Sequence, residues 1–256
     1  MTAPDGRRAE PGELNRSRSP SAPDGRRAEP GELHRSRSQL QPQAVLFDWD
    51  NTLIDGWAAI EAGLNAAFAA FGKPAWTRAQ VLANVRKSLR DSFPEHFGAE
   101  WERARDIFYE AVQASHLAVI RPLPASLHML DSLNHLPLGV VSNKQGGLLR
   151  AEAAHLGWAP RFGAVVGAGD AVADKPSGAP LHLALAQMGL TAGSHIWYVG
   201  DTAIDMQAAR AAGCVAVLLG DAAHDGGIAA CAPDLAFADG VHLASQLAGL
   251  PHTLDK

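Results

Sequence analysis

The chain has 256 residues, of which 47% are hydrophobic and 19% are charged, and its formal net charge is −5. This length and composition are typical of one globular domain with room for a smaller module, and such a chain needs no disulfide or metal to hold its core. The two cysteines lie far apart and form no C-x-x-C pair, which excludes a disulfide scaffold and a Cys-rich zinc module. No apolar run is long enough to span a membrane and no apolar signal segment is visible, so we expect a cytoplasmic protein without membrane partners.

The first 41 residues contain a tandem repeat. Residues 3–19 recur as residues 22–38, with His34 in place of Asn15. Each copy has one leucine to bury, so we predict that residues 1–41 are a disordered tail. Residues 1–38 hold eight Arg and six acidic residues, which leaves a net charge of −7 on the remainder. An acidic body argues against nucleic acid as a partner, and the near balance of charge in the tail favours a duplicated segment without a role over a partner-binding one.

Short apolar runs alternate with helical patterns in the rest of the chain. The apolar runs cover residues 44–47, 138–141, 162–166, 196–199 and 215–218. Continuous runs of this length are typical of strands buried in a parallel sheet. The helical patterns cover about 145–156, 178–188, 203–212 and 242–248. This alternation predicts an α/β fold with a doubly wound, Rossmann-like parallel sheet, in which functional residues lie at the carboxyl ends of the strands.

The interval between the first two predicted strands breaks this alternation. Three helices are expected there, over residues 57–71, 77–92 and 99–117. Thr77 suits an N-cap, and Pro94 is expected in a gap between helices. We therefore predict a helical cap domain at residues 56–118, inserted into a core domain formed by residues 42–55 and 119–256. The alternative is three further helices packed on the sheet.

Two carboxylates follow the first predicted strand directly. Asp48 and Asp50 are two residues apart, and buried carboxylates are costly unless they are paired or bind a cation. Such a pair suits one group that attacks and another that moves a proton. An Asx-rich turn is the alternative for this segment.

The second and third strands are also followed by polar residues. Ser142 and Asn143 follow the second strand and precede a helix, an arrangement that offers a hydroxyl and amide N–H groups to a phosphate. Ser and Asn are also common N-caps. Lys175 precedes the next helix and suits neutralisation of phosphate or of an attacking carboxylate. A solvated loop charge is the alternative for Lys175.

Two further carboxylates follow the strand at residues 196–199. Asp201 and Asp205 lie at i and i+4 across the strand end and the first helical turn. Short oxygen ligands around a loop favour Mg²⁺, which keeps several waters and prefers carboxylate and phosphate. Capping of the following helix by Asp201 or Thr202 is compatible with that role.

Together, the four segments resemble the motifs of the haloacid dehalogenase superfamily of phosphohydrolases over about residues 43–250. The insertion after the first motif resembles the family's C1 helical cap, and Ser142-Asn143-Lys144 is similar to the phosphoglycolate-phosphatase-like members. Asn51, where the family usually has glycine, and Ser177-Gly178-Ala179-Pro180, where relatives often have Pro-x-Pro, depart from the pattern. The matching motif residues are Asp48, Asp50 and Thr52, then Ser142, then Lys175, then Gly200, Asp201 and Asp205.

The resemblance implies a Mg²⁺-dependent phosphatase that acts through an aspartyl-phosphate. Asp48 is then the nucleophile, and Asp50 is the general acid and base. Ser142, the Asn143 amide and Lys175 would hold the phosphate. The metal ligands it implies are Asp48, the Asp50 carbonyl, Asp201 and, indirectly, Asp205.

Other activities are compatible with some of these motifs. A sugar phosphomutase of the same superfamily shares them all, and a non-catalytic phospho-acceptor protein shares a phosphorylated Asp beside Mg²⁺. Dehalogenases lack a carboxylate at the place of Asp50, because halide needs no proton. The partner is expected to be a small phosphorylated metabolite, and the sequence leaves its identity and the oligomeric state open.

Substrate specificity is expected from the cap. Arg86, Lys87 and Arg90 give its second predicted helix an unusual density of basic charge, with Arg86 and Arg90 on one face. A guanidinium binds a carboxylate or a second phosphate with two parallel hydrogen bonds. Arg90 is the favoured candidate because it lies at the helix end, and a solvated helix face is the alternative for the other two.

Overall fold

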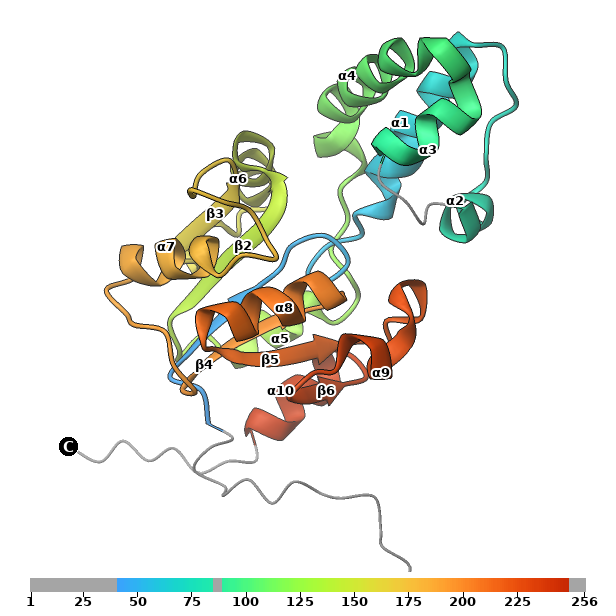
Figure 1. Ribbon diagram of the computed structural model, residues 1–256. Coiled ribbons are helices and arrows are strands. Elements are labelled where there is room, and N and C mark those ends of the chain that lie inside the picture. Colours follow the sequence, from blue (N-terminus) through green and yellow to red (C-terminus); the bar gives the residue numbers. More distant parts are fainter. Residues whose placement is uncertain (1–40, 85–88, 249–256) are drawn as a thin grey trace, which may run out of the picture. The chain divides into compact units, whose positions relative to one another are not determined.

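The computed structural model describes residues 41–84 and 89–248, with the backbone alone for residues 89–91 and 248 (Figure 1). Residues 1–40 of the predicted tail lie outside the described residues, so their disorder stays a prediction. Arg86 and Lys87 also lie outside them. Within the described part of the chain, no helix is long and apolar enough to cross a membrane.

The described residues form one sheet of six parallel strands in the order β3-β2-β1-β4-β5-β6. This confirms the predicted doubly wound parallel α/β fold. The last strand was not predicted, because it is three residues long and two of them are only partly buried or exposed, so it gives no apolar run. The strands are β1 (Ala44–Phe47), β2 (Leu138–Gln145), β3 (Ala164–Ala168), β4 (Ile196–Gly200), β5 (Val215–Leu219) and β6 (Leu235–Phe237).

The sheet is covered on both faces because its strands are apolar on both. In β1, Val45 and Phe47 join one apolar cluster, whereas Ala44 and Leu46 join another, as the period of two in a strand requires. The first cluster includes side chains of α5 (Ser126–Ser132), α6 (Gly146–His155) and α10 (Gly240–Ala248). The second includes side chains of α7 (Ala179–Gln187), α8 (Ala203–Ala212) and α9 (Gly227–Cys231).

The chain reverses its direction of travel through the sheet between β3 and β4. From β1 it moves outward to β2 and β3, and it then returns to β4 on the other side of β1. The connections that leave β1 and β4 therefore diverge, and such a switch point leaves a crevice at the carboxyl ends of the strands. The segments that follow β1, β2 and β4 meet at this edge.

A helical insertion separates β1 from β2. It contains α1 (Trp57–Ala70), α2 (Arg78–Asn84), α3 (Leu89–Phe97) and α4 (Trp101–Val119). Its buried side chains, among them Phe68 and Phe108, form an apolar cluster of their own. A separate cluster is what an independent cap domain needs, and the cap boundaries at residues 56 and 118 stay a prediction.

Two details of this insertion bear on the predicted helices. Thr77 caps α2: its Oγ1 accepts from the Gln80 N–H at 3.3 Å, and its own N–H donates to the Gln80 side chain at 2.9 Å. The prediction that Pro94 lies between helices is wrong, because Pro94 is inside α3. Burial of Phe93 and Phe97 in the apolar cluster offsets the backbone hydrogen bond that proline cannot make.

The close approach of β3 to α6 predicts the effect of a single methyl group. A Cβ at Gly167 would collide with the Cα of Gly146 at the start of α6. We expect Gly167→Ala to lower the free energy of unfolding by about 1–3 kcal/mol, the usual cost of overpacking. Gly147→Ala is the control, because a Cβ there meets nothing within 4 Å. Urea unfolding measures both, and equal stability of the two variants would contradict this packing.

Candidate active site

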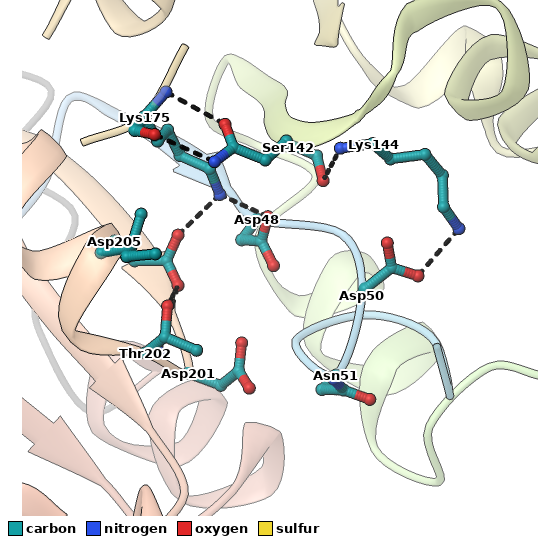
Figure 2. A pocket seen from close by; sticks show the side chains of 11 residues that line it. Asp48, Asp50, Asn51, Ser142, Lys144, Lys175, Asp201, Thr202 and Asp205 are labelled. Atoms are coloured by element: carbon teal, nitrogen blue, oxygen red, sulfur yellow. Dashed lines mark hydrogen bonds and ion pairs between the residues drawn. The ribbon is translucent and has the colours of Figure 1, made fainter. Parts of the chain in front are cut away.

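A pocket of about 310 Å³ lies where β1, β2 and β4 end (Figure 2). The seven core residues predicted to act in catalysis or in phosphate or metal binding all line it, and their chemical roles stay predictions. Arg90 belongs to α3, but its side chain is outside the described residues. The lining residues are Asp48, Asp50, Asn51, Ser142, Asn143, Lys144, Lys175, Asp201, Thr202, Ile204 and Asp205.

The ammonium group of Lys175 is buried between two carboxylates. Its Nζ lies 2.6 Å from Asp48 Oδ1 and 2.7 Å from Asp205 Oδ1 (Figure 2). It also donates to the Tyr198 hydroxyl at 2.9 Å, and that hydroxyl donates to the Val141 carbonyl at 2.7 Å. All donors of the ammonium are therefore used, which makes its burial tolerable.

Burial and mutual charge perturb the acid–base behaviour of this group. Burial raises the pKa of Asp48 to about 7, although Lys175 opposes the shift. Burial would lower the pKa of Lys175, but Asp205 and Asp48 raise it well above its ordinary value. The pKa of Asp205 is lowered, because Lys175 and the hydrogen bonds from Thr202 outweigh its burial. Asp205 is therefore the permanent counter-ion of Lys175, and Asp48 is held less firmly as an anion.

Three carboxylates of the pocket form a candidate cation site. Oxygens of Asp48, Asp201 and Asp205 lie within 4.8 Å of one another, and all three residues are buried. The buried ammonium of Lys175 is shared by two of them, so three carboxylates with one such partner hold excess negative charge. Burial raises the pKa of Asp201, while His224 opposes the shift.

One oxygen of this group is available as a ligand. Asp201 Oδ2 is buried and accepts no hydrogen bond from the described residues. His224 Nε2 lies 3.2 Å from it, within ion-pair distance. A buried carboxylate oxygen without a donor is costly, and a cation would satisfy it. The set of hard carboxylate oxygens therefore fits a divalent ion of the Mg²⁺ type.

Asp50 lies outside that group of oxygens and has a separate partner. Its Oδ1 accepts from Lys144 Nζ at 2.8 Å, and its side chain is 30% exposed (Figure 2). Burial raises the pKa of Asp50, and Lys144 opposes the shift. A carboxyl with a raised pKa at the edge of a pocket suits proton transfer.

The segment after β2 supplies the expected polar groups in a specific way. Asn143 donates its Nδ2 to the Lys175 carbonyl and accepts from the Lys175 N–H, both at 3.0 Å. Its side chain therefore fixes the loop that carries Lys175, and only its main-chain amide is left to bind a phosphate. Ser142 is buried, and its Oγ accepts from the Lys144 N–H at 3.3 Å.

Comparison with known proteins identifies the family. A model of haloacid dehalogenase-like hydrolases matches residues 45–219. The chain belongs to this family. The resemblance drawn from the motifs is confirmed.

Curated relatives narrow the class of enzyme. A phosphoglycolate phosphatase of Yersinia pseudotuberculosis is 32% identical over 226 residues, which cover 84% of this chain and 96% of the relative. A phosphoglycolate phosphatase of Xylella fastidiosa is 35% identical over 179 residues, which cover 67% of this chain and 77% of the relative. The chain is accordingly a phosphatase, a hydrolase of phosphoric monoesters.

Solved structures of the family share the fold. A haloacid dehalogenase-like family hydrolase from Streptococcus pneumoniae superposes with a TM-score of 0.69 at 20% identity, over 80% of this chain and 98% of that one. A subfamily IA hydrolase of the haloacid dehalogenase superfamily from Geobacter sulfurreducens superposes with a TM-score of 0.66 at 20% identity, over 80% of this chain and 96% of that one. At this identity the likeness supports the fold alone.

The family's usual glycine is replaced without loss of the turn. Asn51 has a φ of 63°, a left-handed conformation that Asn tolerates better than most residues. Thr52, the last residue of the first motif, donates its hydroxyl to Asp201 Oδ1 at 3.3 Å. The motifs that follow β1 and β4 are therefore joined directly.

Sequence reasoning missed several side chains around this phosphatase pocket. Tyr198 belongs to none of the motifs, yet its hydroxyl accepts from Lys175 Nζ. His224 and Asp225 also lie outside the motifs, yet His224 lies beside Asp201, and Asp225 accepts from the Ala203 N–H at 2.6 Å. A tyrosine in a fully buried strand was the available signal, since its hydroxyl needs a partner. No signal in the sequence singles out His224.

The raised pKa of Asp48 predicts how stability depends on pH. Asp48 loses its proton near pH 4 in the unfolded chain and near pH 7 in the folded chain. Between these values the folded chain binds more protons, so the free energy of unfolding falls as pH rises. With a chelator present, the Asp48→Asn variant should therefore unfold at a higher temperature than wild type at pH 7. At pH 4 the two unfolding temperatures should be nearly equal. Thermal unfolding across this range measures the difference, and a gain of equal size at both pH values would contradict the assignment.

Proposed function

We propose that this chain is a Mg²⁺-dependent phosphatase that hydrolyses a small phosphoglycolate-like monoester through an aspartyl-phosphate on Asp48. The observation that carries the proposal is the separation of its two neighbouring carboxylates. Asp48 lies buried with Lys175 and the other acidic groups, whereas Asp50 is held by Lys144. Two carboxylates with different surroundings can take different roles in one reaction.

In the first half of the reaction, Asp48 attacks the phosphorus. The carboxylate oxygen forms a bond to phosphorus while the bond to the leaving oxygen breaks. Asp50, in its protonated form, gives its proton to that leaving oxygen. Ser142, the main-chain amide of Asn143 and Lys175 hold the other phosphoryl oxygens.

In the second half, water removes the phosphoryl group from Asp48. Asp50, now a carboxylate, takes a proton from the water as the water oxygen bonds to phosphorus. The bond between phosphorus and the Asp48 oxygen breaks, which releases inorganic phosphate and restores both carboxyl groups. Asp50 thus acts first as an acid and then as a base.

The proposed metal ligands are Asp48, Asp201 and the main-chain carbonyl of Asp50, with Asp205 beside them and not in direct contact with the ion. A bound Mg²⁺ would neutralise the charge that gathers on the transferring phosphoryl group. The buried, donor-free oxygen of Asp201 supports this assignment. Lys175 keeps Asp48 and Asp205 from repelling each other.

The proposed substrate carries a second anionic group beside the phosphate. Curated relatives are phosphoglycolate phosphatases, and Arg90 is the proposed contact for the second anion. A panel of 2-phosphoglycolate, a sugar phosphate, a nucleotide 5′-monophosphate and an aryl phosphate tests this by kcat/KM. A sugar phosphate that is isomerised rather than hydrolysed would indicate a phosphomutase, and phosphorylation without turnover a phospho-acceptor.

Replacement of the nucleophile should abolish turnover without unfolding the chain. Asp48→Asn keeps the shape of the side chain but removes the attacking oxygen anion, so we expect kcat to fall by more than about a thousandfold. Phosphate release measures the loss, and circular dichroism checks the fold. Near-normal turnover by the folded variant would overturn the aspartyl-phosphate.

Removal of divalent metal should silence the enzyme reversibly. Dialysis against EDTA should remove activity and added Mg²⁺ should restore it, whereas Ca²⁺ should inhibit because it prefers larger and looser coordination. Phosphate release under the three conditions measures this. Full activity after exhaustive chelation would show that the acidic group serves another purpose.

A further inference from the structure

Glu152 is a buried carboxylate that the proposed chemistry does not use. It lies in α6, and the residue is 1% exposed. Three side chains from different parts of the chain bind it: Trp49 Nε1 at 2.7 Å, Lys144 Nζ at 2.7 Å, and His116 Nδ1 at 2.8 Å. Burial of a charge at this depth requires such partners.

Each of these three partners belongs to a segment that the active site needs. Trp49 separates the two carboxylates of the first motif, and its indole is fully buried against Trp158 and Phe162. Lys144 ends the second motif, and His116 lies in the last turn of α4, in the helical insertion. Glu152 therefore fixes three segments that are far apart in the sequence.

Lys144 extends this network to the proposed acid and base. Its ammonium lies between two carboxylates, 2.7 Å from Glu152 Oε2 and 2.8 Å from Asp50 Oδ1. The Lys144 side chain is only 12% exposed, so its position is restricted. The direction of the Asp50 side chain thus depends on where Glu152 holds the lysine.

A role for Lys144 in binding the second anion of a substrate is the competing explanation. The lysine lines the pocket, but two carboxylates already neutralise its charge. A substrate anion would have to displace one of them or approach a group with excess negative charge. The contacts therefore favour a lysine that positions Asp50.

We propose that Glu152, through Lys144, is a positioning residue that holds the Asp50 carboxyl where it transfers its proton to the leaving group. The inference rests on the proposed function, because it concerns the acid of that reaction. Glu152 does not touch substrate in this proposal. Its effect should therefore appear only in steps that need the proton of Asp50.

The dependence of rate on the leaving group isolates that step. An alkyl phosphate needs a proton on its leaving oxygen, whereas 4-nitrophenyl phosphate expels a stabilised phenolate that needs none. The ratio kcat/KM covers the steps up to formation of the aspartyl-phosphate, so later hydrolysis does not enter. Comparison of kcat/KM on the two substrates measures how well the acid is positioned.

Glu152→Gln is the decisive variant, since it keeps the shape of the side chain and removes its charge. We expect kcat/KM to fall at least about tenfold on the alkyl phosphate, part of the 10²–10⁴-fold that a general acid contributes, and less than about threefold on 4-nitrophenyl phosphate. Asp50→Asn should show the same selectivity with a larger loss. Arg150→Gln is the matched control on α6, because its partner Asp170 lies outside the network, and it should change neither rate.

The outcomes separate the two proposals. If wild type and Asp50→Asn behave as described but Glu152→Gln loses nothing, or loses equally on both substrates, the positioning role is wrong and the proposed function stands. If Asp50→Asn shows no selectivity, the acid role of Asp50 is wrong and the positioning role falls with it. Should Glu152→Gln fail to fold, Lys144→Gln is tested by the same comparison of kcat/KM on the two substrates. That variant also breaks the link to Asp50, and its side chain is more exposed than that of Glu152.

Discussion

The Lys175 ammonium, buried between Asp48 and Asp205, is the interaction on which the pocket depends. Without it, carboxylates that follow two adjacent strands would repel each other at a depth where water screens their charges weakly. Further contacts hold this lysine in place. Asn143 binds both its main-chain N–H and its carbonyl, and Tyr198 accepts from its Nζ.

The backbone arrangement makes that interaction possible. β1 pairs with β2 on one side and with β4 on the other, all in parallel, so three strand ends meet at one edge. The capping of α8 completes the arrangement, since Asp205 accepts from the N–H and the hydroxyl of Thr202 while its other oxygen binds Lys175. One side chain thus starts a helix and balances a buried charge.

The sequence predicted those parts of the site that depend on local order along the chain. Strand ends are visible as apolar runs that stop at polar residues, and parallel topology then brings the residues after them together. The Glu152 network was not predictable in this way. Its members are separated by up to 103 residues, as in the bond from Trp49, and a glutamate in an amphipathic helix gives no sign that it is buried. The strand β6 and the helical position of Pro94 were missed for a related reason, because tertiary packing decided them against weak local signals.

The two lysines of the pocket divide its charge into separate parts. Lys175 binds Asp48 and Asp205, whereas Lys144 binds Asp50 and Glu152. Carboxylates two residues apart that shared one counter-ion would titrate as a pair, with apparent pKa values that belong to the pair and not to either group. Burial raises the pKa of each carboxyl, and the lysine bound to it is the main opposing influence, so in the proposed reaction the acid–base behaviour of each group is set chiefly by its own partner.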